Sequence, residues 1–109
     1  MAGVVYDSYD PNNRTIEMSA AIDDPRCLTK NVMRELLSYP FEKLKVYRVW
    51  YATPHTNERL VKLAEHLGFT KEAVLKNYFG QKHGVIGRML YPTYRRKYLD
   101  EVPKITRRT

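Results

Sequence analysis

The chain of 109 residues is long enough for one small domain with a single core, and its 43% hydrophobic content excludes a disordered polymer. One cysteine, Cys27, excludes an internal disulfide and predicts a reducing compartment, the cytoplasm. The formal net charge of +7 favours anionic partners, and no apolar run approaches the roughly 20 residues of a membrane-spanning helix, so no membrane partner is expected.

The N-terminal part of the chain predicts a β-hairpin. Residues 3–9 alternate weakly between apolar and polar side chains, and residues 14–22 alternate cleanly. The sequence Asp-Pro-Asn-Asn between them, residues 10–13, is a strong turn signal. We therefore expect two antiparallel strands joined by a short turn.

A helix and a buried strand are expected next. Residues 28–45 have helical periodicity, with an apolar stripe formed by Val32, Met33, Leu36, Leu37, Phe41 and Leu44. Thr29 is a typical N-cap residue, and Pro40 should kink the helix or close its last turn. Residues 45–53 are rich in β-branched and aromatic side chains, which favours a buried strand.

The second half of the chain predicts one more helix, two strands and a tail. The helix spans residues 57–66 and stops at Gly68, and two closing strands flank residues 80–82. Residues 91–109 are polar and basic, and we expect a C-terminal tail with little structure. The predicted domain is therefore residues 1–90. It has an α/β (α+β) fold of order β-β-α-β-α-β-β, with a mostly antiparallel central sheet and two helices.

This order and the segment TNERLVKLAEHLGFTKEAVLKNYFGQKHGVIGRML, residues 56–90, resemble the C-terminal two-thirds of the GNAT N-acetyltransferase superfamily. The motifs that carry the resemblance are Asn57, Gly68-Phe69, Lys71-Glu72 and Leu75-Lys76-Asn77-Tyr78. His83 fits the family's histidine after the last hairpin turn, and residues 35–50 fit its helix and core strand. It extends over roughly residues 3–90. It is strongest with the branch that acetylates protein N-termini and with short GNAT-like proteins of bacteriophages. The complete family fold opens with elements that this chain is expected to lack.

The resemblance implies an acetyl-CoA-dependent N-acetyltransferase that acts on an amine of a protein or peptide. In the family, a strand equivalent to residues 14–22 pairs with the pantetheine arm of acetyl-CoA, and the following loop and helix start bind its pyrophosphate. The implied cofactor-binding residues are Ile22, Arg26, Leu28, Thr29, Lys30 and Asn57. Asn57 matches an asparagine that faces the CoA arm near the thioester. Alternatively Asn57 only caps its helix, and both roles are compatible.

The loop before the first helix departs from the family pattern. Cys27 and Thr29 stand where the family has glycines, and Asp24 stands where it has glutamine or arginine. Arg26 and Lys30 could compensate with side-chain charge, or could form an ordinary solvated helix start.

The catalytic residues stay unassigned. Ala64 replaces a tyrosine that often serves as general acid in the family, and Leu60 replaces a common serine. Tyr78 and His83 are the nearest substitutes, although we expect Tyr78 to be a core strand residue and His83 a turn residue. These departures keep an alternative open: a non-catalytic GNAT-like module for binding or assembly. Such a module would be a phage structural or host-directed protein, in the host cytoplasm or the virion.

Three further expectations concern partners. The shortened fold and an exposed sheet edge at residues 3–9 predict a homo-oligomer or a partner protein that completes the fold. Residues 91–98 mix tyrosines with basic side chains, but a solvated or partner-docking arm is more typical than a nucleic-acid site. The three histidines lack metal-ligand spacing, so we expect no metal.

Overall fold

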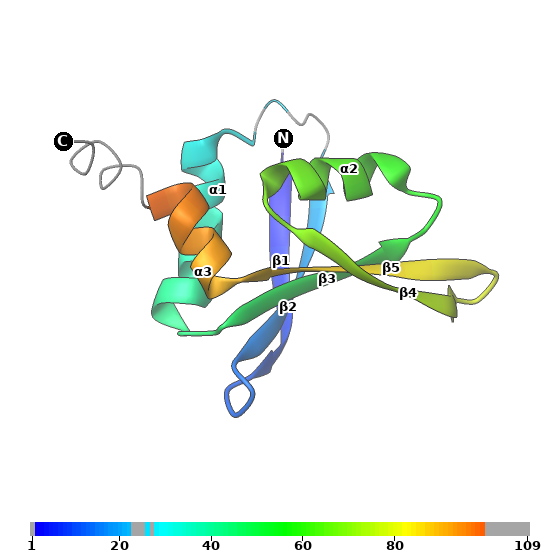
Figure 1. Ribbon diagram of the computed structural model, residues 1–109, viewed down its shortest axis with the longest axis horizontal. Coiled ribbons are helices and arrows are strands. Elements are labelled where there is room, and N and C mark those ends of the chain that lie inside the picture. The colour runs from blue at the N-terminus through cyan, green and yellow to red at the C-terminus, as the bar shows by residue number, and fades with distance from the viewer. Residues whose placement is uncertain (1, 23–25, 27, 100–109) are drawn as a thin grey trace.

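The structure, a computed structural model, describes residues 2–22, 26 and 28–99. Five strands form one sheet in the order β1-β2-β3-β5-β4 (Figure 1). Their bounds are Ala2–Asp10 (β1), Thr15–Ile22 (β2), Arg48–Pro54 (β3), Thr70–Phe79 (β4) and Lys82–Leu90 (β5). β2 and β3 pair in parallel, and the other three neighbouring pairs are antiparallel. This confirms the predicted mostly antiparallel sheet. β1 is an outer strand, as expected, and association through it stays a prediction.

The helical segments begin and end at local sequence signals. They are α1 (Lys30–Ser38), η2 (Tyr39–Lys43), α2 (Glu58–Leu67), α3 (Tyr91–Tyr94) and η3 (Arg95–Leu99), where η2 and η3 are π-helical. Thr29 caps α1 as predicted, because its hydroxyl accepts a hydrogen bond from Val32 N at 3.2 Å. Pro40 lies in η2, where α1 widens and ends. Gly68 ends α2 in the left-handed conformation, with φ of 113°.

The helices cover one face of the sheet. Burial alternates along β3, so that Val49, Tyr51 and Thr53 point to the same face. The helical residues that join the core on this face are Met33, Leu37, Ala64, Tyr94 and Tyr98. Figure 1 shows α1 beside α3 at one end of the sheet and α2 over its other part. Among the described residues, no helix is long and apolar enough to cross a membrane.

The expectation that residues 91–109 have little structure is wrong for residues 91–99. Tyr94 and Tyr98 are 0% and 2% exposed, and Tyr94 stacks on Phe41 with ring centroids 4.8 Å apart. The Tyr94 hydroxyl also donates to the carboxylate of Glu42. The physical reason is spacing: tyrosines at positions 91, 94 and 98 share one helical face, which packs into the core while the basic residues stay outside. Residues 100–109 lie outside the described residues.

Three smaller expectations are also wrong. Val32, placed in the apolar stripe of the first helix, is 37% exposed. Tyr78, expected in the core, is 50% exposed, because β4 is an outer strand and the Tyr78 ring lies over Gly84 of β5. His83 lies in β5, directly after the hairpin turn, where a turn residue was expected.

Candidate functional site

The parallel strands β2 and β3 separate partway along their length. Residues 15–17 of β2 pair with residues 48–50 of β3. Beyond this point β2 continues beside β1 to Ile22, and β3 continues beside β5 to Pro54. Within the described strands the facing edges are not paired with each other after Glu17 and Trp50. An extended ligand can therefore hydrogen-bond to these edges as an added strand does.

A cavity of about 200 Å³ lies where the two strands separate. Its wall combines residues just past the last β2–β3 pair with residues of α1 and α2, and the lining is mainly apolar. The lining residues are Val4, Met18, Ser19, Leu28, Met33, Leu36, Tyr51, Ala52, Thr53, Asn57, Leu60, Leu63, Ala64, Leu67 and Phe69. An apolar wall with few polar groups suits an apolar arm whose few polar atoms fix its orientation.

Asn57 lines this cavity and also caps α2. Its side-chain oxygen accepts a hydrogen bond from Leu60 N at 3.3 Å, and its amide nitrogen donates to the Thr53 hydroxyl at 3.4 Å. Its backbone N–H donates to Pro54 O at 2.9 Å, which closes the turn between β3 and α2. Both readings of Asn57 from sequence, cap and cleft residue, are therefore compatible with its position.

A pair of histidines fixes the turn that carries Asn57. His55 N donates to His83 O at 2.8 Å, and His83 N donates to His55 Nδ1 at 3.0 Å. The Nδ1 atom of His83 accepts from Asn77 N at 3.0 Å. His83 does not line the cavity, and the described residues contain no cluster of potential metal ligands.

The predicted cofactor-binding residues do not all meet at the cavity. Leu28 and Asn57 line it, whereas Lys30 lines a neighbouring cavity. Thr29 acts as the N-cap of α1, and Arg26 is exposed. Ile22 is the last residue of β2, and its side chain lies outside what the structure describes, as do Asp24 and Cys27. Their roles toward a cofactor stay predictions.

The cavity contains a buried tyrosine that the sequence analysis missed. Tyr51 is 7% exposed, and its hydroxyl is buried with no hydrogen-bond partner among the described residues. Burial raises the pKa of Tyr51, and the charge of Glu65 adds to this. The ring packs edge-on against Phe69 and lies over Gly87, where an added Cβ would be 2.6 Å from the hydroxyl oxygen. The hydroxyl is thus directed toward β5, under α2.

The two substitutes for the family tyrosine are not at the cavity. Ala64 does line it, is 7% exposed, and offers no hydroxyl. Tyr78 and His83 are absent from the lining. Strand alternation marks Tyr51 as inward-facing, but the sequence carries no signal for the environment of its hydroxyl.

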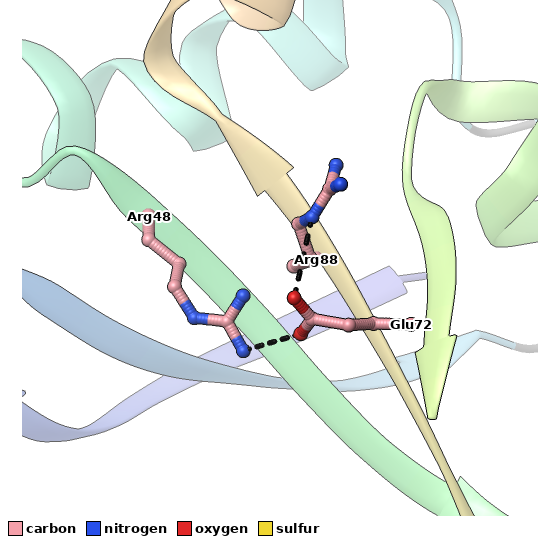
Figure 2. Close-up of polar contacts among 3 residues, drawn as sticks. All are labelled: Arg48, Glu72 and Arg88. Carbon is pink, nitrogen blue, oxygen red and sulfur yellow. Dashed lines mark hydrogen bonds and ion pairs between the residues drawn. The ribbon is translucent and has the colours of Figure 1, made fainter. Parts of the chain in front are cut away.

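The sheet face opposite the helices carries a small ion cluster. Figure 2 shows the Glu72 carboxylate of β4 between the guanidinium groups of Arg48 on β3 and Arg88 on β5. The shortest N···O distances are 2.7 Å to Arg48 and 3.5 Å to Arg88. The hydrogen bond from Arg48 and the charges of both arginines lower the pKa of Glu72. Two guanidinium groups thus share one carboxylate on this face.

The fold and the cavity can now be compared with known proteins. No protein-family model matches the sequence, and no curated protein matches it. A mutant form of the spermidine/spermine N-acetyltransferase SpeG from Vibrio cholerae matches with a TM-score of 0.75 and 19% identity. The match covers 85% of this chain and 60% of the SpeG chain.

Two further solved structures, each described as an acetyltransferase without a named substrate, give similar results. One matches with a TM-score of 0.74 and 22% identity over 87% of this chain and 53% of its own. The other matches with a TM-score of 0.70 and 23% identity over 82% and 54%. This chain thus spans less than two thirds of the chains it matches. The described residues form a partial GNAT-like acetyltransferase fold.

Proposed function

We propose that this protein is an acetyl-CoA-dependent N-acetyltransferase that transfers the acetyl group to an amine. The observation that carries the proposal is the separation of β2 and β3 next to an apolar cavity lined by Asn57, in a fold shared with acetyltransferases. Strand edges without a strand partner suit the amides of a pantetheine arm, and the apolar wall suits its methylene groups.

The residues of the cavity fit this cosubstrate. Met18 and Ser19 on one strand, and Ala52 and Thr53 on the other, would flank the arm, with the amide of Asn57 as a polar contact. Bound acetyl-CoA supplies an acetyl thioester, which an amine attacks directly. The protein then contributes by holding the reactants in register and by excluding water, and neither task requires a nucleophilic side chain.

The acceptor is proposed to be an amine of a protein or peptide. The cavity lining includes Ser19 of β2 and Ala52 of β3. Their neighbours in sequence face the helices, so Ser19 and Ala52 face the opposite side of the sheet. The gap between the two strands therefore leads from the cavity to that opposite face. An acceptor on that face meets Arg48 and Arg88 with one carboxylate between them. Glu17 of β2 faces the same side at the last β2–β3 pair and adds a second carboxylate, so this face presents charges of both signs to the acceptor.

A second candidate is a non-catalytic GNAT-like module that binds a partner or ligand. Ala64 favours it, because no hydroxyl occupies the position of the family's general acid. The two candidates differ in turnover, whereas both allow ligand binding in the cavity.

Isothermal titration with acetyl-CoA and CoA, followed by a CoA-release assay with acidic peptides and spermidine, tests the proposal. Binding in the micromolar range with CoA release that depends on the acceptor is the expected result. An Ala64→Phe variant, which fills the cavity, should lose binding, while Lys43→Met, outside the cavity, should not. Absence of binding at millimolar acetyl-CoA would refute the acetyltransferase. Binding without release for any amine would favour the non-catalytic module.

A further inference from the structure

The β4–β5 hairpin exposes a cluster of large apolar side chains. In the second half of β4, an outer strand, four of them are between 40% and 52% exposed: Val74, Leu75, Tyr78 and Phe79. The Tyr78 ring lies over Gly84, which pairs with Pro54 on the sheet face opposite the helices. Core packing therefore does not account for these rings, and neighbouring apolar side chains on a surface are typical of a binding site.

The hairpin holds its two aromatic rings in place. Asn77 has a φ of 54°, and its side-chain amide donates to Gly80 O at 2.7 Å, which fixes the turn. Tyr78 packs against Gly84, where an added Cβ would be 2.8 Å from the Tyr78 Cβ. The Phe79 ring stands edge-on to the Tyr78 ring, with centroids 5.0 Å apart. A pair of rings that is ordered in advance lowers the entropy cost of binding a ligand.

The charges along this hairpin are all positive. Residues 73–90 include Lys76, Lys82 and Arg88 and contain no aspartate or glutamate. Lys82 is the direct register partner of Phe79, and the side chains of Lys76 and Lys82 are exposed. An aromatic pair thus lies beside basic side chains, and this combination attracts an anionic ligand with flat rings.

The carboxylates of the neighbouring elements do not neutralise this surface. Glu58 and Glu65 of α2 line a cavity together with Val74, on the helix side of the sheet. Glu72 is bound by the two arginines of the ion cluster. Glu17 belongs to β2, which is two strands away from β5. The exposed rings of the hairpin therefore have lysines as their charged neighbours.

We propose that the β4–β5 hairpin binds single-stranded nucleic acid, with bases stacked on Phe79 and Tyr78 and phosphates bound by Lys82 and Lys76. Every base has a π face, so stacking on an exposed ring is possible whatever the nucleotide sequence. A single strand offers flat rings and negative charges at each nucleotide, whereas a duplex buries its base faces. Tyr78 and Phe79 do not line the cavity proposed for acetyl-CoA, so the inference does not depend on the proposed function.

Fluorescence anisotropy of the full chain with labelled oligo(U) and oligo(dT) of about 12 nucleotides tests the proposal. Phe79→Leu removes the ring and keeps apolar bulk, and Lys82→Met removes the charge. The matched controls are Tyr9→Leu and Lys43→Met, because Tyr9 is a 44% exposed tyrosine of β1 and Lys43 is an exposed lysine of η2. A duplex of the same length and polyglutamate serve as competitors. Thermal unfolding of each variant checks that it is folded.

At about 50 mM salt the wild type should bind both single strands. Phe79→Leu should weaken binding about fivefold or more, as the loss of one stacked base implies. Lys82→Met should reduce the slope of log affinity against log salt by about 0.7, the value for one phosphate of a single strand. Both controls should match the wild type.

Three results would overturn the inference. Unchanged affinity in Phe79→Leu, or equal affinity for the duplex, would mean that no base stacks on the hairpin. Polyglutamate that displaces the label as well as an unlabelled single strand would identify an acidic peptide as the better occupant. Absence of binding at about 50 mM salt would exclude a nucleic-acid site. None of these results changes the expectation for acetyl-CoA, which binds elsewhere in the proposed function.

Discussion

Replacing Asn57 with alanine and with aspartate separates its two roles. Alanine removes the side-chain oxygen that accepts from Leu60 N and the amide that lines the cavity. Aspartate keeps an acceptor at the same place, and it is as good an N-cap as asparagine. However, aspartate replaces the amide donor with a negative charge. The alanine variant should therefore lose stability and binding, whereas the aspartate variant should lose binding alone.

The size of each effect follows from the geometry. Loss of an N-cap costs about 0.5–2 kcal/mol. The 3.3 Å distance is long and the bond is exposed, so we expect the lower end of that range. Asn57→Ala should then lower the free energy of unfolding by about 0.5–1 kcal/mol, which corresponds to roughly 2–8 °C in Tm. Asn57→Asp should stay within about 0.5 kcal/mol of the wild type. Both variants should bind acetyl-CoA about tenfold more weakly, as loss of one buried hydrogen bond implies.

Urea unfolding followed by circular dichroism gives the stability of each protein, and isothermal titration with acetyl-CoA gives the affinity. Two results would refute the reasoning. An Asn57→Asp protein with wild-type affinity would mean that the amide does not contact the ligand. An Asn57→Ala protein with wild-type stability would mean that the contact with Leu60 N contributes nothing to α2.

Other predictions test the packing around the site. Gly87→Ala should lower the free energy of unfolding, measured with urea, by about 1–3 kcal/mol, because the new Cβ would lie 2.3 Å from Cε2 of Tyr51 in a packed region. Unchanged stability would show that the Tyr51 ring moves aside at no cost. Tyr98→Phe should cost about 1 kcal/mol, because Leu67 O loses its hydrogen bond, and an equally stable variant would contradict this. Burial raises the pKa of Tyr98 to about 12, and burial also raises the pKa of Tyr6. Both folded-state pKa values exceed the pKa of about 10 of an unfolded tyrosine. The buried, protonated hydroxyls therefore contribute their full share to the free energy of unfolding below about pH 10. This contribution is lost as the pH rises through the folded-state pKa values. The urea concentration at the unfolding midpoint, measured from pH 8 to 12, should therefore decrease once the pH exceeds about 10. The decrease should be less steep for Tyr98→Phe. A midpoint that does not change with pH would count against the burial of these hydroxyls.

Local signals explain why most of the fold could be predicted. The hairpin follows from a turn sequence between two alternating segments, and the helix ends follow from Thr29 and Gly68, whose effects act within one turn. The helical segment at residues 91–99 could not be predicted in the same way. Tyr94 and Tyr98 are buried, and Tyr91 is partly buried, because Phe41 and Leu67, far away in sequence, provide their contacts. Basic composition was therefore a poor guide to its structure.

The candidate site was only partly visible in the sequence. Asn57 could be found because its position before an amphipathic helix is a local pattern. The cavity itself depends on where β2 and β3 stop pairing, which is a property of strand register and leaves no mark on composition. Sequence patterns identify faces of elements, whereas a cleft requires knowing which faces meet.

The alanine at position 64 is compatible with acetyl transfer on chemical grounds. A thiol has a pKa of about 8.5, so a CoA thiolate is a stable leaving group that does not need to be protonated as it departs. The attacking amine has the more demanding requirement, because it must be neutral and aligned with the thioester. Alignment by a fixed cleft supplies most of the rate advantage of such a bimolecular step. In this chain the His55–His83 contacts, the Asn57 cap and the Tyr98–Leu67 hydrogen bond all fix the position of α2 beside the cavity. The proposed transfer therefore depends on the rigidity of α2 more than on a hydroxyl at position 64.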